Sequence, residues 1–413
     1  MSNQISNNKL KNIINKYNLP VIVLLFKDVF NDRELCSDGF LIIKNLVNQQ
    51  LLREKININY KEEEKIDDGY IVYFCVDADL TSIRNICEKI KNNSELKDCF
   101  SLDVISNDVE FIDNNESNVL SINNTKKLEN IINNNLATYV ASFAVRSLLY
   151  EVSTSPKPGL VDRYNSGKHK DMDFYSFMNS ISVLYPYFEK CFIYGRNCND
   201  AVSTFDMLRW PGMMAEGKMF ASTNGSNTHK GAIFSLGLIC GALGRLERSE
   251  WVNSDEILKE CSLMSKGLIE KDLSNITIEN AKTNGQILYA KYGITGVRGQ
   301  AEEGFPIVKE YGLPVLENGL AIGRSFDEAG SAALLSMMVY LIDTNIVSRS
   351  DMQTQKEVSQ KIANLIKNNP YPDIESLYQL DKEFTEMNIS PGGCADLLSV
   401  CYMLYFLKNN EIV

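Results

Sequence analysis

Histidine, tryptophan and long apolar runs are all scarce in this sequence. It has only 2 histidines and 2 tryptophans among 413 residues. No apolar run approaches the roughly 20 residues that cross a bilayer. The apolar segment at residues 21–26 is too short for the core of a secretory signal. We therefore expect a cytoplasmic protein without a membrane partner.

An excess of positive charge is also missing. Against 53 Asp and Glu residues there are 42 Lys and Arg residues, which gives a net charge of −11. Nucleic acids and anionic membranes bind basic surfaces, so neither is expected as the main partner. A polyanionic substrate would need a local cationic pocket, bound metal ions, or both.

Two familiar kinds of site signature are absent. The 10 cysteines contain no Cys-x-x-Cys pair. The nearest pairs, Cys191 with Cys198 and Cys394 with Cys401, have helical rather than zinc-ligand spacing, so we expect reduced core cysteines. There is also no GxxxxGK[ST] and no GxGxxG that opens a helix after a strand. Any bound nucleotide is therefore held without a P-loop or a Rossmann fingerprint.

The length and pattern of the chain predict two domains. A chain of 413 residues exceeds the usual size of one hydrophobic core. Strand-like runs at 21–26 and 70–76, with helical patterns at 40–54 and 81–91, predict a small α/β domain. We place this domain at residues 1–113 and a polar linker at 114–125.

Residues 126–413 are predicted to form one large all-α domain. Strand alternation is scarce there, and apolar residues recur at helical spacing. The predicted helical blocks are 126–150, 173–194, 229–246, 276–292, 328–342 and 391–407. Between them lie short polar segments with glycine, including 208–225 and 296–306, where we expect the chemistry.

Both histidines lie in such polar segments. His169 is in the segment 151–173, and His229 is in the segment 224–231. Because an imidazole titrates near neutral pH, either residue is a candidate for proton transfer or phosphate contact. The alternative is a hydrogen-bonded structural histidine in a turn.

Two segments have the pattern of a helix start that binds phosphate. In the first, Asn227 and Thr228 precede His229, Lys230 and Gly231. The second is the segment 390–393, in which a serine cap and a proline are followed by two glycines. Free N–H groups and the helix dipole attract anions at such ends, although a simple capped helix fits the same pattern.

Acidic residues accompany these segments. Asp171 and Asp173 end the first one, Asp343 follows a very apolar stretch, and Asp396 comes about one turn after the second helix start. Carboxylate oxygens together with substrate phosphates suit Mg²⁺. Each aspartate at a helix end is equally compatible with a capping role.

These segments together resemble the triphosphoribosyl-dephospho-CoA synthases. The resemblance runs in order from Glu151 to Asp396, and it is carried by the segments 155–163, 227–231, 296–306, 343–345 and 390–396. It implies an all-helical transferase in which the 2′-hydroxyl of 3′-dephospho-CoA displaces adenine from ATP. The product is the precursor of the prosthetic group of citrate lyase, or of malonate decarboxylase in related enzymes. Gln300 departs from the family pattern, which usually has Glu there.

The first domain has a weaker resemblance to the apo-citrate lyase phosphoribosyl-dephospho-CoA transferases. It is carried by the segments 17–22, 69–76 and 102–105, and it implies a fusion of two activities. However, the segment 26–33 lacks the Gly-Pro-x-Lys pattern, and the Arg/Cys-rich C-terminal region of that family is missing. We expect a truncated, inactive domain that is retained for docking, with the citrate lyase acyl carrier subunit as partner.

The implied reaction assigns roles to the candidate residues. Breaking an N-glycosidic bond needs stabilisation of positive charge on the sugar, a base for the incoming hydroxyl and help for the leaving base. We hypothesise that the catalytic residues are Glu151 or Asp171 as base and His169 or His229 as proton donor. The residues predicted to bind the phosphates of ATP are Lys157, Arg163, Asn227, Thr228, Lys230, Arg298, Ser390, Gly392 and Gly393. The residues predicted to bind Mg²⁺ are Asp173, Asp343 and Asp396.

Two other functions fit the same residues. The helical ADP-ribosylglycohydrolases also combine acidic helix ends with metal ions, so hydrolysis of a nucleotide's N-glycosidic bond is an alternative. A non-catalytic protein that binds CoA or a nucleotide is another. Adenine release that depends on dephospho-CoA distinguishes the transferase from both.

Overall fold

The structure is a computed structural model that describes residues 16, 21–27, 33–66, 69–78, 80–93, 100–105 and 122–409. The chain divides into two compact units, residues 1–135 and 136–413. Of the predicted linker, residues 122–125 are helical and begin α4, and the rest lies outside the described residues. Residues 17–20 and 28–32, which bear on the N-terminal resemblance, also lie outside them.

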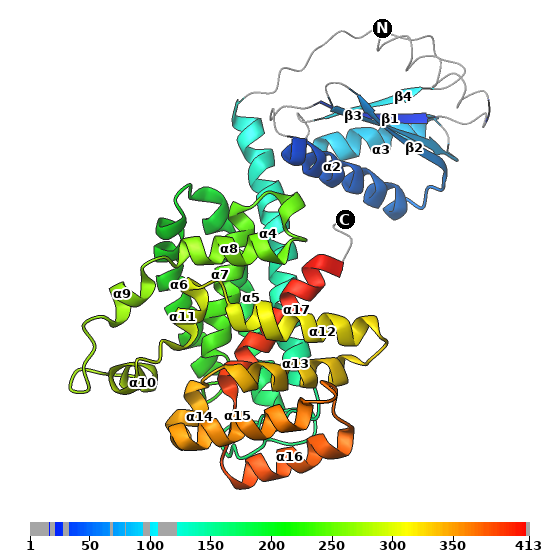
Figure 1. Ribbon diagram of the computed structural model, residues 1–413. Coiled ribbons are helices and arrows are strands. Elements are labelled where there is room, and N and C mark those ends of the chain that lie inside the picture. Colours follow the sequence, from blue (N-terminus) through cyan, green and yellow to red (C-terminus); the bar gives the residue numbers. More distant parts are fainter. Residues whose placement is uncertain are drawn as a thin grey trace. The chain divides into compact units, whose positions relative to one another are not determined.

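In the described part of the first unit, helices accompany a four-stranded antiparallel sheet (Figure 1). Its elements are β1 (Val21–Lys27), α2 (Arg33–Arg53), β2 (Ile58–Ile66), β3 (Gly69–Val76), α3 (Leu80–Asn93) and β4 (Phe100–Ile105). The strand order is β2-β3-β1-β4, and every neighbouring pair is antiparallel. This β-α-β-β-α-β order is a split βαβ arrangement, and it agrees with the small α/β domain predicted from the pattern.

Strand β2 was not predicted, because its sequence is rich in charge. It lies at the edge of the sheet and pairs only with β3. The side chains of Lys61, Glu63 and Lys65 are exposed. Charged residues on an edge strand oppose pairing with other chains, so an edge position explains a strand without an apolar pattern.

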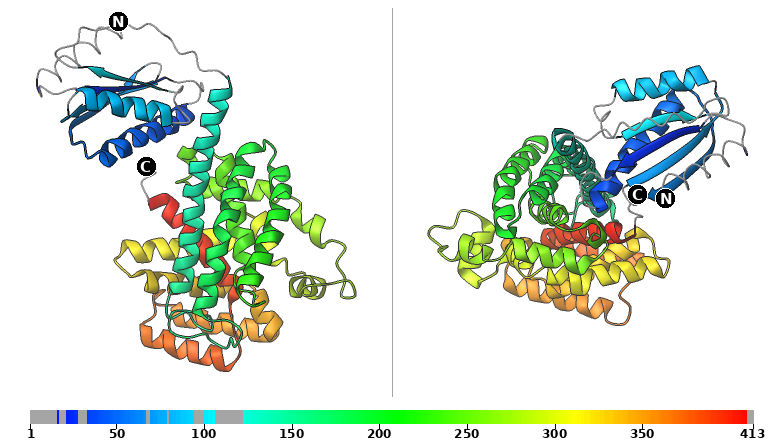
Figure 2. Two further views of the ribbon diagram at one scale, coloured as in Figure 1. Left: turned by 180° about the vertical axis from the view of Figure 1, so that it is seen from behind. Right: turned by 90° about the horizontal axis from the view of Figure 1, so that it is seen from above.

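The second unit is all-helical, as predicted. Its main helices are α4 (Ile122–Ser153, which starts in the first unit), α5 (Phe174–Asn197), α6 (Ala201–Ser222), α7 (Lys230–Arg245), α8 (Ser254–Met264), α9 (Leu268–Leu273), α10 (Asn284–Tyr292), α11 (Gly296–Glu302), α12 (Leu313–Ala321), α13 (Phe326–Tyr340), α14 (Thr344–Arg349), α15 (Met352–Ile366), α16 (Ile374–Glu386) and α17 (Gly392–Asn409). Helix α17 runs through the middle of this unit in both views of Figure 2.

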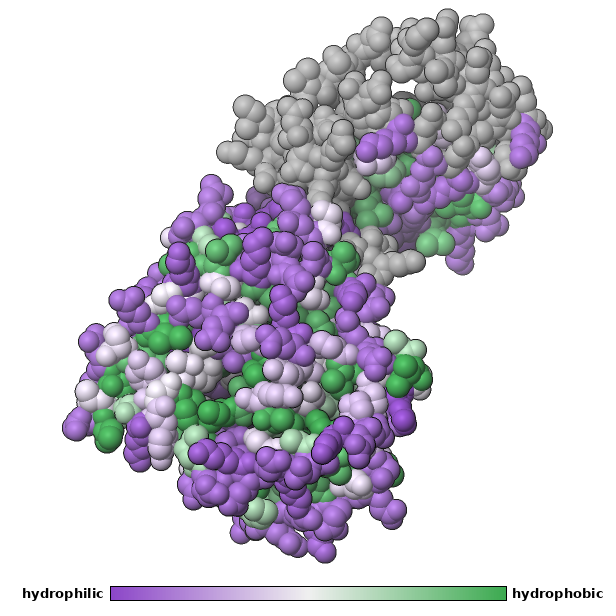
Figure 3. Space-filling view, in the orientation of Figure 1, coloured by the Kyte–Doolittle hydropathy of each residue, from purple (hydrophilic) through white to green (hydrophobic). Residues whose placement is uncertain are grey.

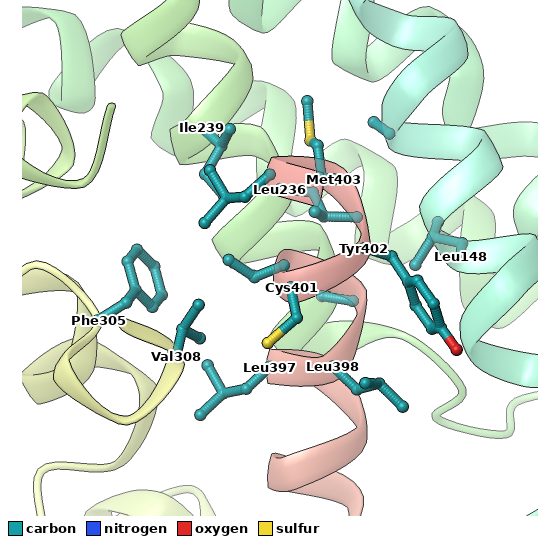
Figure 4. Packing of buried hydrophobic residues seen from close by; sticks show 14 of the residues in the cluster. Leu148, Leu236, Ile239, Phe305, Val308, Leu397, Leu398, Cys401, Tyr402 and Met403 are labelled. Atoms are coloured by element: carbon teal, nitrogen blue, oxygen red, sulfur yellow. The ribbon is translucent and has the colours of Figure 1, made fainter. Parts of the chain in front are cut away.

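Helix α17 carries the centre of the core. Leu397, Leu398, Cys401 and Met403 are buried and face side chains of other helices, including Ile239 of α7 (Figure 4). The cysteines whose side chains the structure describes are free, and all of them except Cys198 are buried, which agrees with the predicted reduced core cysteines. The core therefore fixes the start of α17, where the Ser-Pro-Gly-Gly segment lies.

Two boundaries differ from the sequence pattern. The stretch 208–225 was predicted to connect helices, but residues up to Ser222 belong to α6 despite Pro211 inside the helix. The block at 276–292 was predicted to be helical throughout, but α10 begins only at Asn284, with Thr283 as its cap. Glycine and proline content in the first case, and scattered apolar residues in the second, misled the prediction.

The surface of the second unit is largely polar. Polar side chains are spread over the face visible in Figure 3, with smaller apolar areas between them. Within the ranges that the structure describes, no helix has both the length and the apolar character needed to cross a membrane.

Helices α5 and α7 pack with their backbones in contact. A Cβ atom on Gly195 would lie 2.0 Å from the carbonyl oxygen of Gly241, and one on Gly244 would lie 2.2 Å from the carbonyl oxygen of Phe192. Only glycine fits at such an approach. Because α7 begins at the cavity described below, this contact helps to set the position of that cavity's wall.

We expect Gly195→Ala to lower the free energy of unfolding by about 1–3 kcal/mol, because the added methyl group must push two helix backbones apart. Gly217→Ala in α6 is the matched control, since no atom lies within 4 Å of its added Cβ. The control should be neutral or stabilising by up to about 1 kcal/mol. Urea unfolding of the full chain measures both, and equal effects would contradict the proposed packing.

Candidate active site

A cavity of about 650 Å³ lies in the second unit where several helix ends meet. Its wall contains the end of α4, the loop that follows it, and residues at or near the starts of α7, α10, α11, α14 and α17. The predicted site residues that line it are Glu151, Lys157, His169, Asp171, Asn227, Thr228, His229, Lys230, Arg298, Ser390, Gly392, Gly393 and Asp396. Segments far apart in the sequence thus form one site.

Three predicted residues do not line this cavity. Arg163 pairs with Asp327, and its Nε lies 3.3 Å from Ser155 Oγ. Asp173 caps α5, with the N–H of Ser176 at 2.8 Å from its carboxylate. Asp343 is buried beside the cavity rather than in its wall.

A buried ion pair lies at the end of α4. Lys157 Nζ contacts the carboxylate of Glu151 and donates to the carbonyl oxygen of the same residue at 3.0 Å. Lys157 is 1% exposed and Glu151 is 3% exposed. Burial raises the pKa of Glu151, and the neighbouring ammonium group opposes that change. The cation also faces the negative end of the α4 dipole.

The loop after α4 is held so that Lys157 points inward. Asp162 accepts the N–H of Lys157 at 3.1 Å, and Asp381 of α16 accepts the N–H of Gly159 at 2.9 Å. Gly159 has φ +74°, and a Cβ there would lie 2.4 Å from the carbonyl oxygen of Ile389. This position therefore requires glycine, and the loop is fixed against the segment that leads into α17.

Two carboxylates, the buried Asp343 and the partly buried Asp396, join the first turns of three helices. Asp396 of α17 accepts the N–H of Ala232 in α7 at 2.9 Å. Asp343 accepts the N–H of Asn345 in α14 at 2.8 Å and that of Cys394 in α17 at 2.9 Å. Carboxylates at helix N-termini are stabilised by the dipole and by free N–H groups.

Glycines make these contacts possible. A Cβ on Gly231 would lie 2.1 Å from Asp396 Oδ2, and one on Gly393 would lie 3.0 Å from Asp343 Oδ2. These helix starts were predicted to bind phosphate. In the structure, glycine lets a carboxylate of the protein approach.

The carboxylates in this cluster outnumber the buried cation, Lys157, that lies beside them. Burial raises the pKa of Asp396 well above its usual range, and the nearby charges of Glu151 and Asp343 add to this effect. Burial also raises the pKa of Asp343. Lys157 is the cation that counters Asp396, so full ionisation would leave excess negative charge in a region of low dielectric.

His229 is buried and neutral. It is 2% exposed, its Nδ1 lies 2.7 Å from Ser180 Oγ, and its ring meets that of Phe177 edge to face at 4.9 Å. Burial, with a contribution from Lys157, lowers its pKa to about 3. An imidazole with this pKa carries no extra proton to donate near neutral pH.

His169 connects three parts of the wall. Its Nε2 lies 3.0 Å from Ser390 Oγ, and its Nδ1 lies 3.7 Å from Asp171 Oδ1 and 3.5 Å from Arg349 Nη2. Burial and Arg349 lower its pKa, and Asp171 opposes them. Both ring nitrogens thus face groups of the cavity wall, and the Asp171 side chain beside them is 60% exposed.

Cationic side chains line another part of the cavity. Lys230 pairs with Glu216 at 2.9 Å, and Arg298 pairs at 3.1 Å with Asp272, which also binds Arg209. Arg349 also lines the cavity, but the sequence pattern did not single it out. Its place in the sequence could have pointed to it, because Arg349 is the last residue of α14, the short helix that begins after the predicted site residue Asp343.

Gln300 also lines the cavity, at the position where the family pattern usually has Glu. Its Oε1 accepts the N–H of Ile307 at 3.2 Å. A neutral amide therefore occupies this part of the wall and is held by the backbone.

The fold and the cavity define a class of protein. An all-helical domain that gathers helix N-termini, cations and buried carboxylates around one cavity has the groups that an enzyme acting on a nucleotide polyphosphate needs. Residues 137–412 match the model of the ATP:dephospho-CoA triphosphoribosyl transferase family. The chain belongs to this family.

Curated relatives agree with this assignment. A probable 2-(5''-triphosphoribosyl)-3'-dephosphocoenzyme-A synthase of Streptococcus mutans is 37% identical over 281 residues, which are 64% of this chain and 95% of the relative. The protein of the same name from Albidiferax ferrireducens is 40% identical over 280 residues, 65% of this chain and 90% of the relative. No solved structure matches.

We expect Asp396→Asn to stabilise the fold at pH 8 in buffer without divalent cations. The raised pKa of this buried carboxyl means that the folded chain holds its proton more tightly than the unfolded chain does. Its contribution to stability is therefore present below the unfolded pKa and is lost as pH rises through the folded pKa. Asparagine keeps an acceptor for Ala232 N–H without a charge. The variant should therefore have the higher free energy of unfolding at pH 8.

Urea unfolding at pH 8 and at pH 4 measures this difference. The gain should be smaller at pH 4, close to the unfolded pKa, where only about half of the carboxyls in the unfolded chain are ionised. A variant that is less stable than the wild type at pH 8 would show that the cluster of buried carboxylates does not strain the fold.

Proposed function

We propose that the second unit transfers the triphosphoribosyl group of ATP to the 2′-hydroxyl of 3′-dephospho-CoA and releases adenine. The observation that supports this most strongly is that the segments of the family resemblance line a single cavity. Family membership supports the same reaction. We place the reaction in the cytoplasm and its product in the assembly of the citrate lyase prosthetic group.

Asp171 is the better candidate for the base. Its carboxylate lines the cavity and is exposed to it, whereas Glu151 is already paired with Lys157. His169 lies between Asp171 and Ser390 and would position the base. The 2′-hydroxyl oxygen of dephospho-CoA bonds to C1 of the ribose of ATP, and the proton of that hydroxyl passes to Asp171. The electron pair of the broken C1–N9 bond leaves with adenine, which takes up a proton, so no net proton is released.

Glu151 would stabilise the sugar. An oxocarbenium-like transition state carries positive charge, and the carboxylate of Glu151, which lines the cavity, would oppose that charge. Positioning of two nucleotides adds to the rate, up to about 7–11 kcal/mol in well-oriented cases.

The triphosphate would bind to the cationic part of the cavity. Lys230, Arg298 and Arg349 supply charge, and Asn227 fixes the helix start by accepting Lys230 N–H at 3.2 Å. Phosphate oxygens would compete with Glu216 and Asp272 for the first two cations. Arg163 and Asp173 have no place in this arrangement.

The donor set fits a Mg²⁺ ion that binds together with the phosphates. Asp396 lines the cavity and lies in a cluster with excess negative charge. Among the described residues, no group of three or more His, Cys, Asp or Glu side chains forms a site by itself. Since Mg²⁺ usually takes one or two carboxylates plus substrate phosphates, Asp396 would hold it. Asp343, which accepts the N–H of Cys394 in the first turn of α17, would support that helix start. When bound, the ion would neutralise charge on the triphosphate.

We further propose that the first unit does not transfer the finished group and instead docks the citrate lyase acyl carrier subunit. The family match begins at residue 137, after the end of this unit, so the proposal rests on the sequence resemblance. The full chain mixed with the apo subunit and the finished precursor should form a complex on size-exclusion chromatography without covalent modification. A mass increase of the subunit would contradict this.

Incubation with ATP, Mg²⁺ and dephospho-CoA, followed by mass analysis, tests the main proposal. We expect adenine and the triphosphoribosylated product in equal amounts, and we expect Asp171→Asn to lower the rate at least about 100-fold, as for loss of a general base. The matched control is Asp173→Asn, because Asp173 only caps α5 and asparagine caps equally well. Adenine release without dephospho-CoA would favour a hydrolase, and binding without turnover would favour a regulator. Full activity of Asp171→Asn would refute the choice of base.

A further inference from the structure

Part of the cavity wall is apolar. The apolar side chains in the cavity wall include Leu148, Leu160, Val161, Met172, Phe177 and Phe220. Phe177 and Phe220 are only partly buried, so their rings retain accessible surface.

Contacts between segments place part of this set next to His229. The Phe177 ring meets the His229 ring, and the N–H of His229 lies 3.2 Å from the sulfur of Met219, the neighbour of Phe220. Ser226 Oγ donates to the carbonyl oxygen of Asp171 at 2.6 Å, which ties the segment before α7 to Met172. We call Met172, Phe177, Phe220, Thr228 and His229 the aromatic corner.

Two buried polar atoms in the aromatic corner have no partner among the described residues. They are His229 Nε2 and Thr228 Oγ1. Both residues line the cavity. Buried polar atoms are nearly always hydrogen-bonded, so two unpartnered atoms on residues that line a cavity indicate a ligand with complementary groups.

The chemistry of the corner selects a flat, uncharged ligand. Apolar and aromatic walls disfavour phosphate but stack well on a nucleobase. Burial keeps the pKa of His229 at about 3, with Lys157 as the charged group that acts on it, so the ring is neutral at working pH. Ser180 Oγ is within hydrogen-bond distance of Nδ1, and if its hydroxyl donates there, the single ring proton is on Nε2.

We infer that the aromatic corner binds the adenine base of ATP, with His229 Nε2 donating to a ring nitrogen and Thr228 Oγ1 accepting from the amino group. Adenine presents N7 as acceptor beside N6–H₂ as donor, whereas guanine presents two acceptors there. The aromatic corner would thus distinguish adenine from guanine. This inference rests on the proposed function, because ATP is the substrate named there, and it makes His229 a specificity residue rather than a proton donor.

Calorimetric titration of the full chain with ATP, GTP and inorganic tripolyphosphate, at equal Mg²⁺, tests the inference. His229→Asn is the main variant, because its amide reaches the position of Nδ1 and keeps the Ser180 contact but does not reach the position of the unpartnered Nε2. His229→Gln is the matched control, since its amide reaches the position of Nε2. Thr228→Val and Thr228→Ser form a second pair, and thermal melting confirms that each variant is folded.

The wild type should bind ATP at least about tenfold more tightly than GTP, consistent with one or two hydrogen bonds to the base. His229→Asn and Thr228→Val should each weaken ATP binding about tenfold and leave tripolyphosphate binding unchanged. Glutamine and serine should restore most of the loss. The ratio of wild-type to His229→Asn affinity should stay constant from about pH 6 to 8, because a group with a pKa of about 3 does not titrate there.

Equal losses of ATP and tripolyphosphate affinity in both loss variants, or equal wild-type affinity for ATP and GTP, would overturn the inference. The two proposals fail separately. Base-selective ATP binding without product formation would refute the transferase and leave the adenine subsite standing. Normal product formation by variants that keep full ATP affinity and selectivity would refute the subsite and leave the transferase standing.

Discussion

The carboxylates of Asp343 and Asp396 hold together the first turns of α7, α14 and α17, and the cavity depends on these contacts. Each carboxylate accepts backbone N–H groups that a helix cannot satisfy internally, so it stabilises the helix end that it meets. Gly231 and Gly393 allow the close approach. The buried pair of Glu151 and Lys157 brings the end of α4 to the same place. Four helix ends are thus fixed around one space before any substrate binds.

The same arrangement lowers the free energy of unfolding. Burial and mutual repulsion raise the pKa of Asp396, and Lys157 offsets only part of the negative charge. Apolar residues of α17 such as Leu398 and Met403 are fully buried, and their burial contributes stability that offsets this loss. We interpret the excess negative charge as the basis of function, because a cationic transition state, or a cation bound to the triphosphate, would neutralise it.

Most of the site could be predicted because polar, glycine-bearing segments between helices are easily recognised in the sequence. What the pattern could not provide was orientation. Asp173 and Asp343 have the sequence context of metal ligands, but in the structure their oxygens accept backbone N–H groups. The neutrality of His229 depends on burial and Lys157, and its fixed orientation depends on Ser180, 49 residues earlier in the chain. In the first unit, β2 was missed because its charge reflects an edge position that only the sheet order reveals.

The central claim is that a triphosphate and a divalent cation bind together in the cavity and balance its charges. Asp396 is the residue that couples the binding of the two. The melting temperature of the wild type and of Asp396→Asn with tripolyphosphate, with Mg²⁺ and with both measures this coupling directly. The account predicts that the two ligands together raise the wild-type melting temperature by more than the sum of their separate effects, and that this excess disappears in Asp396→Asn. An excess of the same size in the variant, or none in the wild type, would contradict it.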